Sequence, residues 1–173
     1  RLSERPLGLH LVQAVVAGCK AEPALNVWYD STAGTRVLVQ RIDIAIAVDT
    51  PEGLFVPVLR NCGKRDAADL RRGLDAMRRD VQSRAIPPEE LRGGTITLSN
   101  FGMIGGRYAA PVVLPPTVAI VGAGRIHERV VAAGGAPAVR RVLPLSITFD
   151  HRAVTGGEAG RFLAAMIADL QRA

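Results

Sequence analysis

The sequence predicts an α/β fold, a two-layer sandwich in which helices flank a mixed β-sheet. Two observations lead to this class. Segments in which apolar residues alternate are interspersed with segments in which they recur every three or four positions, so strands and helices are mixed along the chain. The 173 residues, 48% of them hydrophobic, suffice for one domain with a sizeable core. Because no repeat, linker or low-complexity segment divides them, we expect a single domain over residues 1–173.

Three segments have the periodicity of helices with one apolar face. In 9–20 the apolar residues form a stripe, and Pro23 follows as a stop signal. In 66–84 apolar residues recur at steps of three and four, with arginines on the other faces. The third segment, 159–170, follows two glycines that permit a tight reversal. A shorter helical turn is expected at 87–91.

The alternating segments predict strands, and two segments are expected to form hairpins. The first hairpin turns at 30–34, and its Trp28 is expected in the core. In 54–59, Pro57 lacks the amide hydrogen that a sheet interior requires, so this strand is expected at an edge or to be irregular. The expected strands and hairpins span 24–40, 42–48, 54–59, 95–99, 117–121, 130–142 and 144–151.

A net charge of +6 raises the question of an anionic partner, which could be nucleic acid, an acidic protein or a phosphorylated cofactor. Nucleic acid is disfavoured because the arginines are interleaved with acidic residues and only 4% of the residues are aromatic, too few for a stacking platform. No apolar run is long enough to span a bilayer, and no signal-peptide pattern is present. We therefore expect neither a nucleic-acid nor a membrane partner.

The spacing of the cysteines and histidines argues against a metal site. Cys19 and Cys62 are far apart and form no CxxC pair, so neither a disulfide framework nor a zinc site is expected. The histidines, His10, His127 and His151, lack any ligand spacing such as HExxH. For the first two we expect ordinary core or surface roles.

His151 stands between the predicted strand 144–151 and the predicted helix 159–170. The positive end of a helix dipole disfavours the charged imidazole, which keeps such a histidine available as a proton acceptor near neutral pH. A lone histidine at a strand end is more often a hydrogen-bonded structural residue. Its position therefore makes His151 a candidate base and no more.

Two further patterns point to other chemistries. The glycines of 122–124 follow a strand, but His127 stands where the third glycine of a dinucleotide fingerprint belongs, and no helix follows. Ser99, Asp150 and His151 supply the residue types of a serine hydrolase in the right order. However, Ser99 lacks the GxSxG elbow, and the adjacent Asp150 and His151 point to opposite faces of a strand. The hydrolase stays as a weaker alternative.

The segment DHRAVTGGEAGRFL, which contains His151, resembles the DHRxxDG signature of the dihydrolipoamide acyltransferases, the core components of 2-oxo acid dehydrogenase complexes. Further segments are similar to successive blocks of that family, in the family's order and over nearly the whole chain: NVWYD, DIAIAVDTPEGLFVPV, EELRGGTITLSNFGMIGG, APVVLPPTVAIVGAG and LPLSITFDHR. The resemblance implies a fold similar to chloramphenicol acetyltransferase. It also implies that the opening part of the catalytic domain, and the lipoyl and partner-binding domains that usually precede it, are absent from this chain.

The resemblance implies catalytic roles for three residues. His151 falls on the family's general base and Ser99 on the serine that stabilises the transition state. In the family these two groups meet where neighbouring protomers of a trimer touch. Thr155 stands where the family has aspartate, and sometimes asparagine, and the acidic residue forms an ion pair that helps hold the active-site loop. Threonine cannot supply that charge, although its hydroxyl can form a hydrogen bond.

The resemblance also implies the substrates. An acyl group is moved between dihydrolipoamide, whose lipoyl group is carried on a separate domain, and coenzyme A. Acetyl ranks first as the acyl group, branched-chain acyl second and succinyl third. We expect Ser99, Phe101, Gly102 and Arg125 to contact coenzyme A, and we expect no metal.

The expected assembly is a homotrimer that builds a larger cubic or dodecahedral core. Its partners in the resemblance are a 2-oxo acid decarboxylase and dihydrolipoamide dehydrogenase, in the bacterial cytoplasm or, in a eukaryote, in the mitochondrial matrix. A core-forming homologue without catalytic activity is the main alternative, because Thr155 departs from the family pattern.

Overall fold

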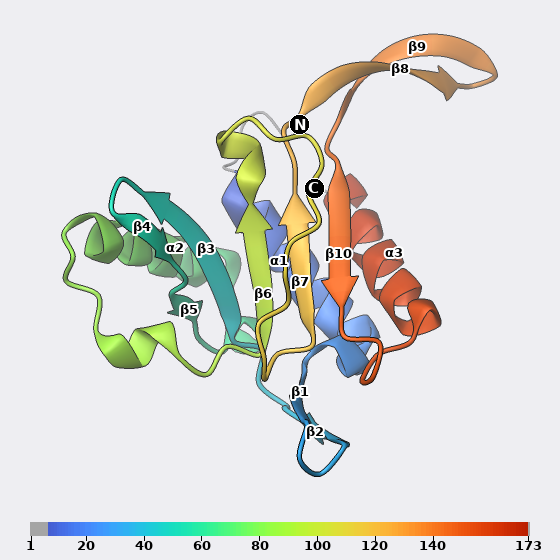
Figure 1. Ribbon diagram of the computed structural model, residues 1–173. Coiled ribbons are helices and arrows are strands. Elements are labelled where there is room, and N and C mark those ends of the chain that lie inside the picture. Colours follow the sequence, from blue (N-terminus) through green and yellow to red (C-terminus); the bar gives the residue numbers. More distant parts are fainter. Residues whose placement is uncertain (1–6, 173) are drawn as a thin grey trace.

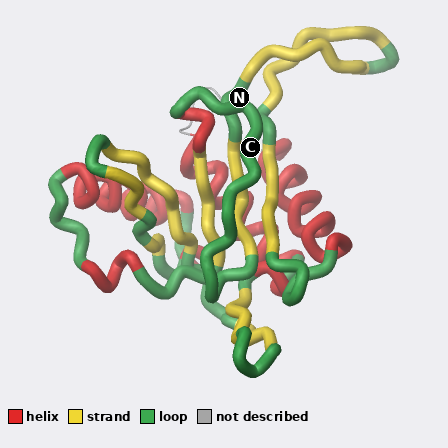
Figure 2. Tube along the Cα trace, viewed as in Figure 1, coloured by secondary structure: helices red, strands yellow, loops and turns green. Residues whose placement is uncertain are grey.

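A β-sheet and three helices form two layers (Figure 1, Figure 2). The computed structural model describes residues 7–172, so residues 1–6 and 173 of the predicted domain lie outside the described part. All three α-helices cover the same face of the sheet, which confirms the predicted α/β sandwich. None of the helices in the described range is long and apolar enough to cross a membrane. The helices are α1 (Leu7–Ala21), α2 (Ala67–Gln82) and α3 (Gly156–Arg172).

The central sheet is mixed, as predicted. Its strand order is β10-β7-β6-β3-β4, and β5 pairs with β3 on the same side as β4. The three inner strands β3, β6 and β7 are parallel, whereas β10, β4 and β5 are antiparallel to their neighbours. The strands are β3 (Ile44–Thr50), β4 (Gly53–Phe55), β5 (Val58–Leu59), β6 (Ile96–Asn100), β7 (Ala119–Ala123) and β10 (Leu145–Phe149).

The hydrophobic core lies between the helices and the sheet, and α1 and α3 cross closely within it. Phe162 of α3 is fully buried. A Cβ atom at Gly18 of α1 would lie 2.8 to 3.0 Å from the Phe162 ring, so this close crossing requires glycine. Both free cysteines, Cys19 and Cys62, are buried, and burial raises the pKa of the Cys62 thiol to about 11.

Two hairpins project from opposite ends of the sheet (Figure 1). The first joins β1 (Val27–Asp30) to β2 (Thr35–Leu38) and confirms the predicted hairpin. The second joins β8 (His127–Ala133) to β9 (Ala136–Val142), beginning three residues earlier than predicted. Its two turn residues, glycines 134 and 135, both have positive φ, which suits the twist of a two-residue hairpin turn.

Of two predictions about single residues, the one for Trp28 is wrong and the one for Pro57 is confirmed. Trp28 was expected in the core, which is wrong: the side chain is half-buried, its indole N–H donates to the Gly94 carbonyl oxygen at 2.9 Å, and the guanidinium of Arg41 lies 5.9 Å from the ring centroid. Pro57 does interrupt its strand, dividing it into β4 and β5 at the sheet edge. The Pro57 carbonyl still accepts a hydrogen bond from the Ile46 amide.

A buried polar cluster joins the starts of β3 and β6. The backbone N–H of Asp43 donates to the Thr95 hydroxyl at 3.0 Å, and this hydroxyl donates to Asn26 Oδ1 at 2.6 Å. The Asn26 amide nitrogen donates to the carbonyl oxygens of Val39 and Arg41. The cluster therefore fixes the chain between the first hairpin and the sheet while it satisfies groups that would be costly to bury alone.

Candidate active site

His151 lies in a tight turn between the end of β10 and the start of α3. The backbone N–H groups of Ala153 and Val154 both donate to the Asp150 carbonyl oxygen, at 3.0 and 2.9 Å. The Ala153 and Val154 side chains are buried and anchor the turn, whereas the His151 side chain is exposed. The imidazole centroid lies 5.0 Å from that of Phe149. The fold thus presents this histidine at the surface, in reach of another molecule.

Ser99 is placed near the end of β6 between two small neighbours. Its register partners are Ala47 on β3 and Gly122 on β7. A Cβ atom at Gly122 would lie 2.6 Å from the Ser146 hydroxyl and 2.9 Å from the Phe101 ring, so glycine is required there. The Ser99 side chain between them is half-buried.

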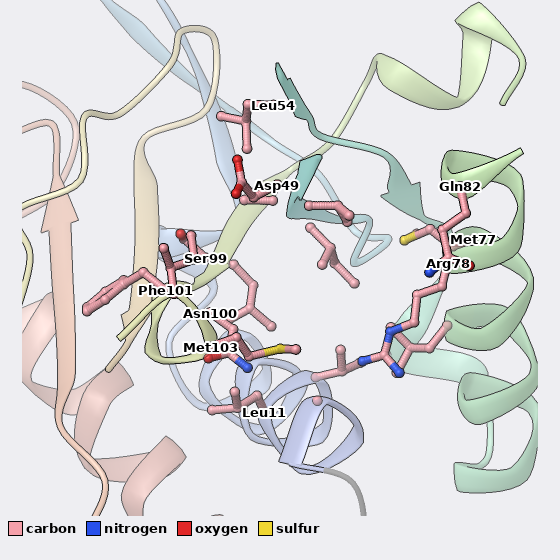
Figure 3. Close-up of a pocket in the computed structure, with 18 residues that line it drawn as sticks. Leu11, Asp49, Leu54, Met77, Arg78, Gln82, Ser99, Asn100, Phe101 and Met103 are labelled. Carbon is pink, nitrogen blue, oxygen red and sulfur yellow. The ribbon is translucent and has the colours of Figure 1, made fainter. Parts of the chain in front are cut away.

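Ser99 also lines a cavity of about 520 Å³ between the sheet and helices α1 and α2. Arg78 of α2 and Ser99 lie on opposite sides of it (Figure 3). Its lining is largely apolar, with a few polar groups, as is usual for small-molecule sites. The polar side chains on its wall are Asp49, Arg78, Gln82, Ser99 and Asn100.

The four residues expected to contact coenzyme A gather at the same end of the sheet. Phe101 and Gly102 directly follow β6, in a short 3-10 helix. A Cβ atom at Gly102 would lie 2.5 Å from the carbonyl group of Gly124 and 2.6 Å from the Arg125 nitrogen, so the two backbones pack against each other. The Arg125 side chain is exposed. Ser99, two residues before Phe101, completes this group.

Within one chain, Ser99 and His151 lie at opposite ends of the sheet. In the register of the sheet, Ser99 pairs with Gly122 of β7, and Gly122 pairs with Ser146 of β10. Phe149, where β10 ends, is instead level with Ala119 at the start of β7. Three residues of strand separate these levels by about 10 Å, and the histidine lies two residues further on. The arrows of β6 and β10 point in opposite directions in Figure 1.

This separation excludes a serine-hydrolase triad within a single chain. Ser99 and His151 cannot form a hydrogen bond across the length of the sheet. Asp150 is engaged by Arg152, whose guanidinium binds both carboxylate oxygens at 2.6 to 3.2 Å and holds the Asp150 pKa below its usual value. The three residues therefore do not form a serine-hydrolase triad within one chain.

Thr155 is the residue that caps α3. Its hydroxyl accepts a hydrogen bond from the Glu158 amide at 3.3 Å, and the Glu158 carboxylate accepts from both the Thr155 amide, at 2.7 Å, and its hydroxyl, at 2.8 Å. This reciprocal arrangement is a capping box. These hydrogen bonds, with help from Arg36, lower the pKa of Glu158 to about 2. Glu158 was not among the predicted site residues, although its T-x-x-E spacing before a helix is the signal of a capping box.

No cluster of metal ligands accompanies these residues. In the part of the chain that the structure describes, no group of three or more His, Cys, Asp or Glu side chains is arranged to hold a metal ion. His10 is buried in α1, and His127 begins β8. The predicted catalytic residues offer the His151 imidazole and the Ser99 and Thr155 hydroxyl groups.

Comparison with known structures first defines the class. The chain has the fold of chloramphenicol acetyltransferase, with a TM-score of 0.62 and 17% identity over 96% of this chain and 78% of that one. It is more similar to the cubic core of a pyruvate dehydrogenase multienzyme complex, with a TM-score of 0.90 and 30% identity over 95% and 68% of the two chains. This confirms the predicted fold class.

A third solved structure is that of the dihydrolipoamide acetyltransferase of Azotobacter vinelandii. Its TM-score is 0.87 and its identity 30%, over 95% of this chain and 68% of that one. That structure belongs to an investigation of the roles of a serine, a histidine and an asparagine in the catalytic mechanism of that enzyme.

Sequence comparison then defines the family. Residues 8–173 match the catalytic domain of the 2-oxoacid dehydrogenases acyltransferase family, and the chain belongs to this family. This confirms the predicted resemblance to the dihydrolipoamide acyltransferases.

The names of the curated relatives specify different acyl groups. The acetyltransferase component of the pyruvate dehydrogenase complex of Mycoplasma pneumoniae is 37% identical over 87% of this chain and 38% of its own length. The human mitochondrial succinyltransferase component of the 2-oxoglutarate dehydrogenase complex is 37% identical over 88% and 34%. The acyltransferase component of the branched-chain complex of Pseudomonas aeruginosa is 40% identical over 90% and 36%. The chain thus spans little more than a third of the length of these relatives.

Proposed function

We propose that this chain is the catalytic core of a dihydrolipoamide acyltransferase, which moves an acyl group between a lipoyl thiol and the thiol of coenzyme A. One observation carries the proposal. The serine and histidine studied in the Azotobacter enzyme are 52 residues apart, and its asparagine follows the histidine by four residues. Ser99, His151 and Thr155 have the same two separations in this chain.

The chemistry needs a base and a hydrogen-bond donor. A thiol with a pKa of about 8.5 is mostly protonated at neutral pH, so His151 takes the proton from the attacking thiol. Attack on the thioester carbonyl makes an oxyanion, which the Ser99 hydroxyl stabilises; loss of such a donor typically costs about 2.7–4 kcal/mol. The imidazolium then returns the proton to the departing thiolate, so one base serves both directions.

The proposed site is shared between copies of the chain. The placement of Ser99 and His151 at opposite ends of one sheet supports this, because only two copies can bring such groups together. A segment after β6 carries large apolar side chains that one chain leaves exposed, a surface suited to a second copy. These side chains are Met103, Ile104, Tyr108, Val112 and Leu114. We propose a homotrimer that builds a larger cubic or dodecahedral core.

The substrates and partners extend the same proposal. Acetyl is ranked first as the acyl group, branched-chain acyl second and succinyl third; relatives for all three are of similar identity. Ser99, Phe101, Gly102 and Arg125 are proposed to contact coenzyme A, because they gather at the end of the sheet beside the cavity. A 2-oxo acid decarboxylase and dihydrolipoamide dehydrogenase are the proposed partners. The bacterial cytoplasm or the mitochondrial matrix is the proposed compartment, supported by relatives of both origins.

A subunit-mixing experiment tests the shared site. Ser99→Ala and His151→Ala are each expected to lose most coenzyme A-dependent acylation of dihydrolipoamide. When the two inactive variants are unfolded together and reassembled, a centre built from Ser99 of one copy and His151 of another regains both groups. In randomly mixed rings, about a quarter of the centres are complete, so activity returns to roughly a quarter of the wild-type value.

The outcomes separate the alternatives. Equal rates for wild type and His151→Ala would end the enzymatic proposal and favour the non-catalytic core homologue. Loss in both variants without recovery on mixing would contradict a centre shared between copies. Ester hydrolysis without coenzyme A that disappears in Ser99→Ala would instead favour the hydrolase. Rates with acetyl, branched-chain acyl and succinyl thioesters rank the substrates by kcat/KM.

A further inference from the structure

Two residues of the β1–β2 hairpin contact the turn that contains His151. Tyr29 of β1 and Arg36 of β2 are direct cross-strand partners. Arg36 Nη1 donates a hydrogen bond to the Ala153 carbonyl oxygen at 3.1 Å. The guanidinium of Arg152 lies over the Tyr29 ring, 4.8 Å from its centroid. Because Arg152 and Ala153 directly follow His151, the hairpin holds the backbone on one side of the histidine.

An ion pair joins the same hairpin to α3. Arg36 Nη1 lies 3.1 Å from Glu158 Oε1. The other carboxylate oxygen, Oε2, accepts from the amide and the hydroxyl of Thr155. The Glu158 side chain is only 17% exposed, so the pair is partly shielded from solvent and salt. One carboxylate therefore connects β2 with the last residue of the turn.

We infer that Arg36, Glu158 and Tyr29 are positioning residues for His151. The inference rests on the proposed function, because the direction of the imidazole matters only if it acts as the base. The His151 side chain is exposed, with the Phe149 ring beside it at 5.0 Å between centroids, so the backbone of the turn sets where the imidazole starts from the chain.

Three contacts fix that backbone at three separate points. Arg152 binds the Asp150 carboxylate before the histidine and stacks on the hairpin after it. Arg36 holds the carbonyl of Ala153. Glu158 holds the amide at the end of the turn. Loss of either member of the Arg36–Glu158 pair removes part of this hold and lets the turn shift, and a catalytic group misplaced by about 1 Å loses up to roughly a hundredfold in rate.

Steady-state kinetics of the assembled protein test this role. Arg36→Gln and Glu158→Gln are each expected to lower kcat by about ten- to a hundredfold, with KM for coenzyme A changed by less than about twofold, because binding groups at the other end of the sheet are untouched. The double variant is expected to lose less than the product of the two single losses, since the two residues share one ion pair. Arg36→Lys keeps the charge but lacks the planar fork, so it recovers part of kcat.

Two controls make the result decisive. Arg72→Gln removes another exposed arginine, which pairs with Asp69 on α2 far from the turn, and it is expected to leave kcat unchanged. His151→Ala is measured alongside. Normal kcat in Arg36→Gln beside an inactive His151→Ala would overturn the positioning role alone. Equal activity in His151→Ala and wild type would overturn the proposed function, and the positioning role with it.

Discussion

At Gly102 the fold depends on the absence of a side chain. Gly102→Ala would place a Cβ atom 2.5 Å from the Gly124 carbonyl group, which is backbone and cannot rotate away. We expect a loss of about 1–3 kcal/mol in the free energy of unfolding, measured by urea denaturation, and a higher KM for coenzyme A as the segment after β6 shifts.

Gly160 provides the matched control for that substitution. A Cβ atom there would meet nothing within 4 Å, and the residue lies inside α3. Gly160→Ala is therefore expected to raise the free energy of unfolding by up to about 1 kcal/mol. Equal effects of the two substitutions would show that the backbone contact at Gly102 is unimportant.

The depressed pKa of Glu158 predicts a pH dependence of stability. In the folded chain this pKa is about 2, against 4.5 for a free glutamate side chain. The carboxylate's hydrogen bonds and ion pair thus stabilise the fold above about pH 4.5, and this contribution is lost as the pH falls toward 2. Glu158→Gln is expected to be less stable than wild type at pH 7, with the difference shrinking as acid is added.

Urea midpoints at several pH values between 7 and 3 measure this difference. Glu89→Gln, at an exposed position in the 3-10 helix Pro88–Leu91, serves as the control and should follow wild type. A gap between wild type and Glu158→Gln that stayed constant with pH would contradict the assigned ion pair.

Among the secondary-structure elements, α1 and α3 depend most on one another. Phe162 is fully buried where the two helices cross beside Gly18. Phe162→Ala is expected to cost about 3–5 kcal/mol in the free energy of unfolding, because the helices cannot close the resulting gap. Thermal and urea unfolding followed by circular dichroism test this; a cost below about 1 kcal/mol would mean that the crossing repacks.

The elements themselves were largely predictable from the sequence, because helix and strand periodicity is local. All three helices lie within three residues of the predicted segments. Pro57 correctly marked an irregular edge, since its missing amide hydrogen acts within its own strand. Trp28 was misplaced because its partner, the Gly94 carbonyl, is 66 residues away and no local pattern announces it.

Over the whole molecule, the sequence pointed to candidate site residues but not to their positions in the fold. The family resemblance pointed to Ser99 and His151, whereas their placement at opposite ends of one sheet follows from a strand order that no periodicity encodes. The contact of Glu158 with Thr155 could have been predicted from the T-x-x-E capping pattern. Arg36 was not, because its contact with Ala153 joins residues 117 positions apart.

The exposed apolar segment after β6 predicts how the proposed assembly can be broken. Val112 is 77% exposed in a single chain. Val112→Lys is expected to lower the molar mass measured by light scattering and to reduce activity in parallel, because burying a charge at a contact between copies is costly. Ile167→Lys, on α3 across the sheet, is the control. An unchanged mass for Val112→Lys would remove this segment from the proposed contact.

In the proposed homotrimer, the end of one sheet that carries Ser99 meets the end of the next copy's sheet that carries His151, so the contacts between copies run head to tail. An open row of copies would always end in one lone hydroxyl and one lone imidazole, whereas a closed ring leaves none. Under the proposed function, the number of complete centres equals the number of chains only when the ring closes. Turnover per chain would then report ring closure itself, and dilution that opens rings would lower it before any chain unfolds.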